Sequence, residues 1–298
     1  MPQPQVIFKQ KKIPVPGCGG CTGGASVIEW GGFIIEKRGS DMNASLILRP
    51  FNGLFLLIFA GFSLVFLILS LILRRCSDKV RRGVLAGLML FTLVFFVWYK
   101  IMLSLDTEYS ALCAAAGKGA FSWWGELPFQ LCNINMILIP VAMLTKKRSL
   151  MGFSFFMGVL GAAMALSMPG VGFQDCSILL PRMIGFYFTH FMVFFGSIAL
   201  VSFGIYRPRF RDLPLVVVSV LVLSFVIFLF NMVLRLTGLH PFANYFFSVE
   251  TEGNPILELF HSWLPYPYLF LLPSFLILIP YMLLVTALLN IGGKRKET

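Results

Sequence analysis

The chain has 298 residues, of which 58% are hydrophobic and only 12% are charged, and its mean hydropathy is +0.85. Because soluble domains carry about 25% charged residues, this composition excludes an ordinary soluble protein and indicates one compact helical membrane domain. The net charge of +11 would suit a nucleic-acid-binding protein, but the basic residues lie beside apolar segments rather than in one patch. We therefore interpret them as topology signals and expect no nucleic acid partner.

Residues 1–50 precede the first long apolar segment and are rich in Gly and Pro. We expect a poorly ordered arm on the extracytoplasmic side. An alternative is that the chain starts at Met42, which precedes the first span much as an initiator would. Cys18 and Cys21 form a CxxC pair, but no second pair or histidine lies nearby, so we expect no metal site there.

Seven stretches reach the roughly 20 apolar residues that an α-helix needs to cross a bilayer. We expect an all-α, polytopic membrane domain over residues 51–291 and a basic cytoplasmic tail over residues 292–298. The seven predicted transmembrane helices are Leu54–Leu73, Val84–Leu103, Leu127–Thr145, Leu150–Met168, Met183–Tyr206, Leu213–Leu234 and Leu264–Asn290.

The connections between these spans alternate in basic charge. The first, third and fifth connections and the C-terminal tail together hold fourteen Lys and Arg residues, whereas the other three connections hold only Lys118, Arg182 and Arg235. Because connections rich in Lys and Arg stay on the cytoplasmic side, we expect the N-terminus outside, or in a lumen, and the C-terminus in the cytoplasm.

Cys132 and His190 lie inside two of the predicted spans, each near the end that we expect on the outer side. At about 1.5 Å per residue, Cys132 lies about 7 Å below Leu127 and His190 about 10 Å below Met183. A cysteine beside a histidine at the same depth in a membrane provides the nucleophile and the base that acyl transfer through a thioester intermediate needs.

Further polar residues gather in the same shallow layer. Glu126, Gln130 and Asn133 form an i, i+4, i+7 stripe next to Cys132 on the predicted helix. Asn231 lies about 5 Å from the outer end of the sixth span, and Arg235 follows one turn later. Polar groups in lipid are costly and usually mark function, so the layer predicts a pocket open to the outer leaflet.

Each of these residues also has a purely structural interpretation. A buried cysteine most often acts as a small hydrophobic side chain, and a lone histidine in a helix is often hydrogen-bonded to a backbone carbonyl. Asn and Gln commonly join transmembrane helices to one another. The shared depth of Cys132 and His190 is what favours the functional interpretation.

Four short blocks carry a resemblance to a known family: Glu126–Ile134 (ELPFQLCNI), Phe188–His190 (FTH), Ala243–Phe246 (ANYF) and Leu264–Tyr268 (LPYPY). In this order they resemble the signature blocks of the YwaF-like family, which includes the eukaryotic transmembrane protein 164. The resemblance runs from about the first predicted span to the last and leaves residues 1–50 uncovered.

The resemblance implies a lipid acyltransferase that uses a membrane-embedded cysteine and histidine to build polyunsaturated ether phospholipids. By position, these residues are Cys132 and His190. Bacterial members usually have His where this chain has Gln130 and Asp where it has Asn133. Both differences remove an ionisable group beside the cysteine, so the activation of Cys132 is left to His190.

The expected reaction starts from a thiol whose pKa is normally about 8.5, so Cys132 needs His190 to take its proton. The thiolate attacks the ester of a donor phospholipid and forms a thioester. The hydroxyl of a lysophospholipid then attacks this thioester and accepts the acyl group. We expect no metal and no cofactor, because no zinc-type spacing and no nucleotide-binding loop is present. The expected substrate-binding residues are the oxyanion donors Gln130, Asn133 and Asn231 and the phosphate ligands Arg182 and Arg235.

Other interpretations stay open at this level. A transporter, or a membrane protein that binds a substrate without catalysis, is the main alternative, although a transport site is expected near the midplane in broken helices. Water in place of the lysolipid would make the same site a hydrolase. Cys113 and Cys176 share the expected outer side, where a disulfide can form. The expected location is the plasma membrane in a bacterium and the endoplasmic reticulum in a eukaryote, and nothing in the sequence indicates the oligomeric state.

Overall fold

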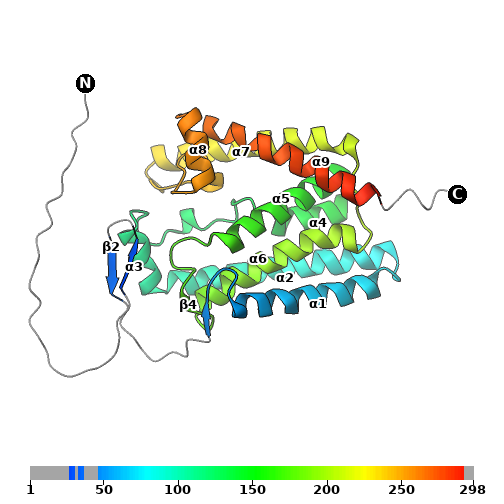
Figure 1. Ribbon diagram of the computed structural model, residues 1–298, viewed down its shortest axis with the longest axis horizontal. Helices are drawn as coiled ribbons and strands as arrows, with labels where there is room; N and C mark the ends of the chain where they lie inside the picture. Colours follow the sequence, from blue (N-terminus) through cyan, green and yellow to red (C-terminus); the bar gives the residue numbers. More distant parts are fainter. Residues whose placement is uncertain (1–26, 31–32, 37–45, 292–298) are drawn as a thin grey trace, which may run out of the picture. The chain divides into compact units, whose positions relative to one another are not determined.

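The computed structural model describes residues 27–30, 33–36 and 46–291 (Figure 1). The chain divides into two units, Met1–Asn43 and Ala44–Thr298. In the first unit, β1 (Val27–Trp30) and β2 (Phe33–Glu36) form an antiparallel pair. The CxxC pair, Met42 and the basic tail lie outside the described residues.

The second unit is helical and contains the candidate site. Its α-helices are α1 (Gly53–Leu73), α2 (Asp78–Ser104), α3 (Thr107–Ala115), α4 (Asn135–Thr145), α5 (Arg148–Ser167), α6 (Pro181–Ser202), α7 (Leu213–Leu236), α8 (Pro255–Trp263) and α9 (Phe275–Ile291). Four short 3₁₀ segments connect them: η2 (Trp123–Gly125), η3 (Phe210–Asp212), η4 (Tyr245–Phe247) and η5 (Leu269–Ser274). The predicted all-α class is thus confirmed.

Two strands of two residues each tie the beginning of this unit to a later connection. β3 (Ile47–Leu48) pairs antiparallel with β4 (Cys176–Ser177), and Arg49 bonds the carboxylate of Asp175. Residues 46–50, which we grouped with the N-terminal arm, therefore belong to the helical unit in the structure.

Six helical segments of the described chain are long and apolar enough to cross a membrane, where the sequence predicted seven. They are α1, α2, α5, α6, Phe210–Leu236 and Leu269–Ile291. The difference lies in the predicted span Leu127–Thr145, which is helical only from Asn135 onward, as α4. The residues before Asn135, Pro128 among them, form turns instead. The seven-span count and the orientation stay predictions.

The long helices lie side by side in layers, with α6 near the centre and α7 and α9 together in one outer layer (Figure 1). α6 packs most extensively on α5 and α2, and α4 packs on α2 and α5. Over the most apolar 18 residues of each helix, 72% of the residues are buried in α6, whereas only 17% are buried in α1. His190 therefore lies on the most enclosed span, and α1 presents most of its surface outward.

Gly185 sets the distance between α6 and α2. A Cβ atom at this position would lie 2.1 Å from Cδ2 and 2.3 Å from Cγ of Tyr99, a residue that is buried on α2. No L-side chain fits there without separating the helices. The close approach brings α2, which carries Lys100, against the helix that carries His190.

We expect Gly185→Ala to lower the free energy of unfolding by about 1–3 kcal/mol, because the added methyl overpacks the interface with Tyr99. Gly87→Ala on α2 is the matched control, since no atom lies within 4 Å of the position that its added Cβ would take. The control should be neutral or stabilising by up to about 1 kcal/mol, because alanine favours the helix. Thermal unfolding in detergent measures both, and equal melting temperatures would contradict the packing argument.

Candidate active site

The segment that carries Cys132 is a chain of turns rather than a helix. The amide of Asn135 donates to the carbonyl of Cys132 at 3.2 Å, and the amide of Met136 donates to that of Asn133 at 3.0 Å. These short-range bonds satisfy the backbone just before α4 begins. The predicted i, i+4, i+7 stripe is therefore wrong as a helical face, although its residues remain close to one another along the chain.

The third and first family blocks meet in space at Tyr245. Its hydroxyl donates to the carbonyl of Trp124 at 2.7 Å and accepts the amide of Leu127 at 3.0 Å. The side-chain oxygen of Gln130 accepts the amide of Phe246 at 3.1 Å. Tyr245 and Phe246 thus hold both ends of the turn segment that leads to Cys132.

Gly161 on α5 supports the same segment from another side. A Cβ atom there would lie 3.3 Å from the backbone nitrogen of Cys132 and 3.4 Å from Cγ of Leu131. The absence of a side chain lets α5 pack directly on the cysteine's backbone, so the position of Cys132 is fixed by α5 as well as by the Tyr245 loop.

Cys132 and His190 lie next to each other, as the sequence analysis predicted. Sγ of Cys132 lies 3.3 Å from Nε2 of His190, and each residue is 7% exposed. The imidazole packs on the ring of Phe186, with 4.2 Å between ring centroids. The structure thus brings the two side chains into contact, while their catalytic roles stay predictions.

The second nitrogen of His190 fixes the orientation and the tautomer of the ring. Nδ1 lies 2.7 Å from the carbonyl oxygen of Phe186. A carbonyl accepts only, so Nδ1 carries the hydrogen and donates, and Nε2 is left with a lone pair. The hydrogen-bond pattern therefore assigns Nε2 as the acceptor for the thiol proton.

Two side chains contact the sulfur of Cys132. The side chain of Asn133 is one of them, with Oδ1 3.6 Å from Sγ, and Nε2 of His190 is the other. An Asn amide can present either its oxygen or its NH₂ group. Asn133, which is 9% exposed, is thus the predicted oxyanion donor that the structure brings to the site.

His190 lies in the interior of α6. The helix begins at Pro181, so His190 is about 14 Å along a helix of about 33 Å. Cys132 contacts His190 there, and the segment that carries it is made of turns rather than a helix. Non-helical backbone is tolerated at such depth where protein surrounds it.

Lys100 is the site residue that the sequence analysis missed. Its ammonium lies 2.6 Å from the carboxylate of Glu126, with side-chain exposures of 11% and 17%, and it lies over the rings of Phe96 and Tyr99. Through Glu126 it is joined to the start of the turn segment that leads to Cys132. A lysine inside an apolar span is costly and usually functional, and this signal was present in the sequence.

Tyr109 on α3 completes the ion pair by donating to Glu126 at 3.2 Å. Burial, together with the nearby Glu126 carboxylate, raises the pKa of Tyr109, so the phenol stays protonated and remains a donor. Burial likewise raises the pKa of Cys113. Cys113 and Cys176 are both free thiols, and no bridge joins them.

The other predicted binding residues have structural partners. Asn231 is fully buried and bonds both backbone groups of Tyr245 and the hydroxyl of Ser248, so its amide is occupied within this loop. Arg235 bonds the carbonyl of Ala243 and the carboxylate of Glu250. Arg182 is 1% exposed and bonds Asp106 at 2.7 Å and Glu108 at 3.0 Å.

These contacts separate the predicted residues into two groups. Cys132, His190 and Asn133 come together, whereas the other four hold surrounding loops and helices. Phosphate binding by Arg182 or Arg235 would have to compete with the carboxylates that they already hold, and it stays a prediction. Among the described residues, no group of three or more His, Cys, Asp or Glu is placed to hold a metal.

Six apolar spans around a buried Cys–His pair define an integral membrane protein with a candidate thiol site. The chain belongs to the TMEM164 family, because the family model matches residues 49–286. Searches of curated proteins and of solved structures find no match to the chain. The predicted family is thus confirmed, and the match covers every residue of the site.

We expect Lys100→Met to lower the free energy of unfolding by about 3 kcal/mol or more, because it leaves the Glu126 carboxylate buried without a cation. Lys100→Met combined with Glu126→Gln should restore most of the loss. Lys118→Met, which breaks the more exposed pair with Glu252, is the control and should cost less than about 1 kcal/mol. Thermal unfolding in detergent gives the ranking, and equal losses for the two single variants would contradict it.

Proposed function

We propose that this protein is a phospholipid acyltransferase that carries the acyl group on Cys132 and uses His190 as the base. The single observation that carries the proposal is the contact of 3.3 Å between Sγ and Nε2, with Nδ1 bonded to a carbonyl. A nucleophile within hydrogen-bond reach of a base, which is itself oriented by a third group, is the arrangement used in covalent catalysis.

In the first step the proton of the Cys132 thiol passes to Nε2 of His190. The sulfur attacks the ester carbonyl carbon of a donor phospholipid, and the C–O bond to the glycerol oxygen breaks. His190 returns the proton to this oxygen, so the products are a thioester on Cys132 and a neutral lysolipid hydroxyl. Asn133, with its amide turned to present NH₂, is placed to donate to the oxyanion.

In the second step a lysophospholipid hydroxyl attacks the thioester. His190 takes the hydroxyl proton, a new ester bond forms, and the sulfur leaves as a thiolate that regains the proton from His190. Water in place of the lysolipid gives a free fatty acid by the same sequence. The low exposure of both side chains, 7% each, favours transfer over hydrolysis because it limits access of water.

A lipid substrate requires an opening in the layer that surrounds the pair. We propose that the turn segment 126–134 moves to admit it, because turns without a continuous helical ladder deform more readily than α5 or α6. We also propose the orientation with the basic connections in the cytoplasm, as their Lys and Arg content predicts. This orientation places the Glu126 end of the turn segment 126–134 toward the outer leaflet or the lumen.

One observation favours a second candidate function, transport or binding of a substrate without catalysis. A non-helical segment at about the middle of α6 resembles the broken helices that form transport sites. In that case Cys132 and His190 would contact a substrate without forming a covalent bond. The two functions differ in whether Cys132 is acylated.

We expect Cys132→Ala to reduce acyl transfer between a phosphatidylcholine donor and a lysophospholipid to background. His190→Ala should reduce it by about 10²–10⁴-fold, because the thiol loses its base. The measurement is the rate of transfer by the purified chain in mixed micelles, followed by lipid mass spectrometry. Cys113→Ala and Cys176→Ala are matched controls that remove free thiols outside the proposed site.

The controls should retain transfer within about twofold, since neither residue contacts Cys132 or His190 within the part of the chain that the structure describes. Full activity of Cys132→Ala would exclude the thioester mechanism. Transfer lost equally in all four variants would indicate a general effect on folding instead.

A further inference from the structure

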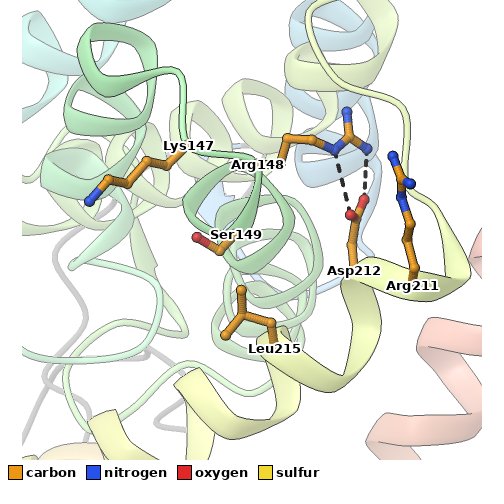
Figure 2. A pocket seen from close by; sticks show the side chains of 6 residues that line it. All are labelled: Lys147, Arg148, Ser149, Arg211, Asp212 and Leu215. Atoms are coloured by element: carbon orange, nitrogen blue, oxygen red, sulfur yellow. Dashed lines mark hydrogen bonds and ion pairs between the residues drawn. The ribbon is translucent and has the colours of Figure 1, made fainter.

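A hollow of about 310 Å³ lies where α5 and α7 begin, at the end of α4 and α5 away from Cys132 (Figure 2). Its lining residues come from two places in the chain: Lys147, Arg148 and Ser149 at the start of α5, and Arg211, Asp212 and Leu215 at the start of α7. From Arg148 to Gly161, the α5 residue that packs on Cys132, the rise is about 20 Å. The hollow is therefore separate from the thiol site.

The charges around this hollow do not balance. Arg148 bonds the carboxylate of Asp212 through Nη2 at 2.7 Å and Nε at 3.5 Å, so these two groups neutralise each other. Among the described residues, the side chains of Lys147 and Arg211 have neither an ion pair nor a hydrogen bond. The hollow thus has an excess of two positive charges.

These cations lie on both sides of the opening. Figure 2 shows Lys147 on one side of Ser149 and the guanidinium groups of Arg148 and Arg211 on the other side, with the Lys147 side chain extended away from Ser149. The Lys147 side chain would have to turn back to reach a group seated over Ser149, which would then meet positive charge from two directions. No side chain caps the first turn of α5, so its backbone N–H groups add to the positive potential there.

Arg148 is fixed in position by its neighbours, together with Asp212. Its guanidinium lies over the ring of Tyr206, 5.1 Å from the centroid, and Nη2 also donates to the carbonyl of Arg207 at 2.8 Å. Among the described lining residues, Lys147, Arg211 and the hydroxyl of Ser149 are the free donors, and together they form a donor set that recognises a phosphate group.

The apolar surface next to the hollow indicates that this phosphate belongs to a lipid. Leu215 is 55% exposed, and an exposed apolar stripe continues from it along α7 at helical spacing: Val218, Val222 and Phe225. A free phosphate ion gains nothing from such a stripe, whereas the acyl chains of a phospholipid would cover it. Spans α5 and α7 both begin here, which is the depth at which lipid headgroups lie.

We propose that this hollow binds the phosphate headgroup of an anionic phospholipid, whose acyl chains lie along the exposed face of α7. Lys147 and Arg211 contact the phosphate, Ser149 donates to it, and Leu215 begins the apolar contact. The lipid joins α5, which supports the Cys132 segment, to α7, which holds the Tyr245 loop through Asn231. The site does not depend on chemistry at Cys132.

Native mass spectrometry of the full chain in detergent tests this proposal, with dioleoyl phosphatidic acid, dioleoyl phosphatidylcholine and inorganic phosphate as separate probes. We expect phosphatidic acid to bind the chain more tightly than phosphatidylcholine does. Lys147→Gln combined with Arg211→Gln should weaken phosphatidic acid binding at least about tenfold. Arg75→Gln combined with Lys79→Gln removes the same charge outside the hollow and should leave binding unchanged.

Leu215→Asp provides a second variant that keeps both cations. It places a carboxylate at the edge of the hollow on an exposed position, so folding should be retained while phosphatidic acid binding falls. Equal weakening by the two double variants would overturn the proposal, because binding would then follow net charge alone. Saturable binding of inorganic phosphate as tight as that of phosphatidic acid would overturn the assignment to a lipid.

Discussion

The candidate site depends on one constraint: a cysteine must lie on non-helical backbone inside a bundle of apolar helices. Backbone groups at such depth must all be bonded within the protein. Turn bonds at Asn135 and Met136 satisfy part of the segment, and the hydroxyl of Tyr245 satisfies the amide of Leu127. With these bonds made, the Cys132 thiol is held against the imidazole of His190 rather than turned away along a helix.

Residues with no proposed role in the reaction bring distant parts of the chain to this segment. Asn231 bonds both backbone groups of Tyr245, and Phe246 adopts a left-handed backbone with φ of 60° while its amide bonds Gln130. A bulky residue in this conformation is strained and persists only where its surroundings fix it. Polar residues that resemble substrate ligands in the sequence are therefore used to position the cysteine.

Much of the fold follows from the sequence, since long apolar stretches predicted six of the helical segments to within six residues of their bounds in the structure. Hydropathy does not register that the residues before Asn135 form turns, so the predicted helical start at Leu127 and the helical polar stripe were wrong, while the count of seven spans stays a prediction. The contact of Cys132 with His190 was predicted from their similar positions below the outer ends of two predicted spans. The Lys100–Glu126 pair was missed because hydropathy averages a single lysine into its apolar surroundings.

The most direct test of the central claim is whether Cys132 becomes acylated. Purified protein is incubated with a phosphatidylcholine that carries one labelled acyl chain, quenched in acid, and analysed by peptide mass spectrometry. The account predicts the mass of the acyl chain on the peptide that contains Cys132, removed by neutral hydroxylamine because the bond is a thioester, and discharged when a lysophospholipid is added. An unmodified Cys132 under conditions in which labelled product accumulates would contradict the account.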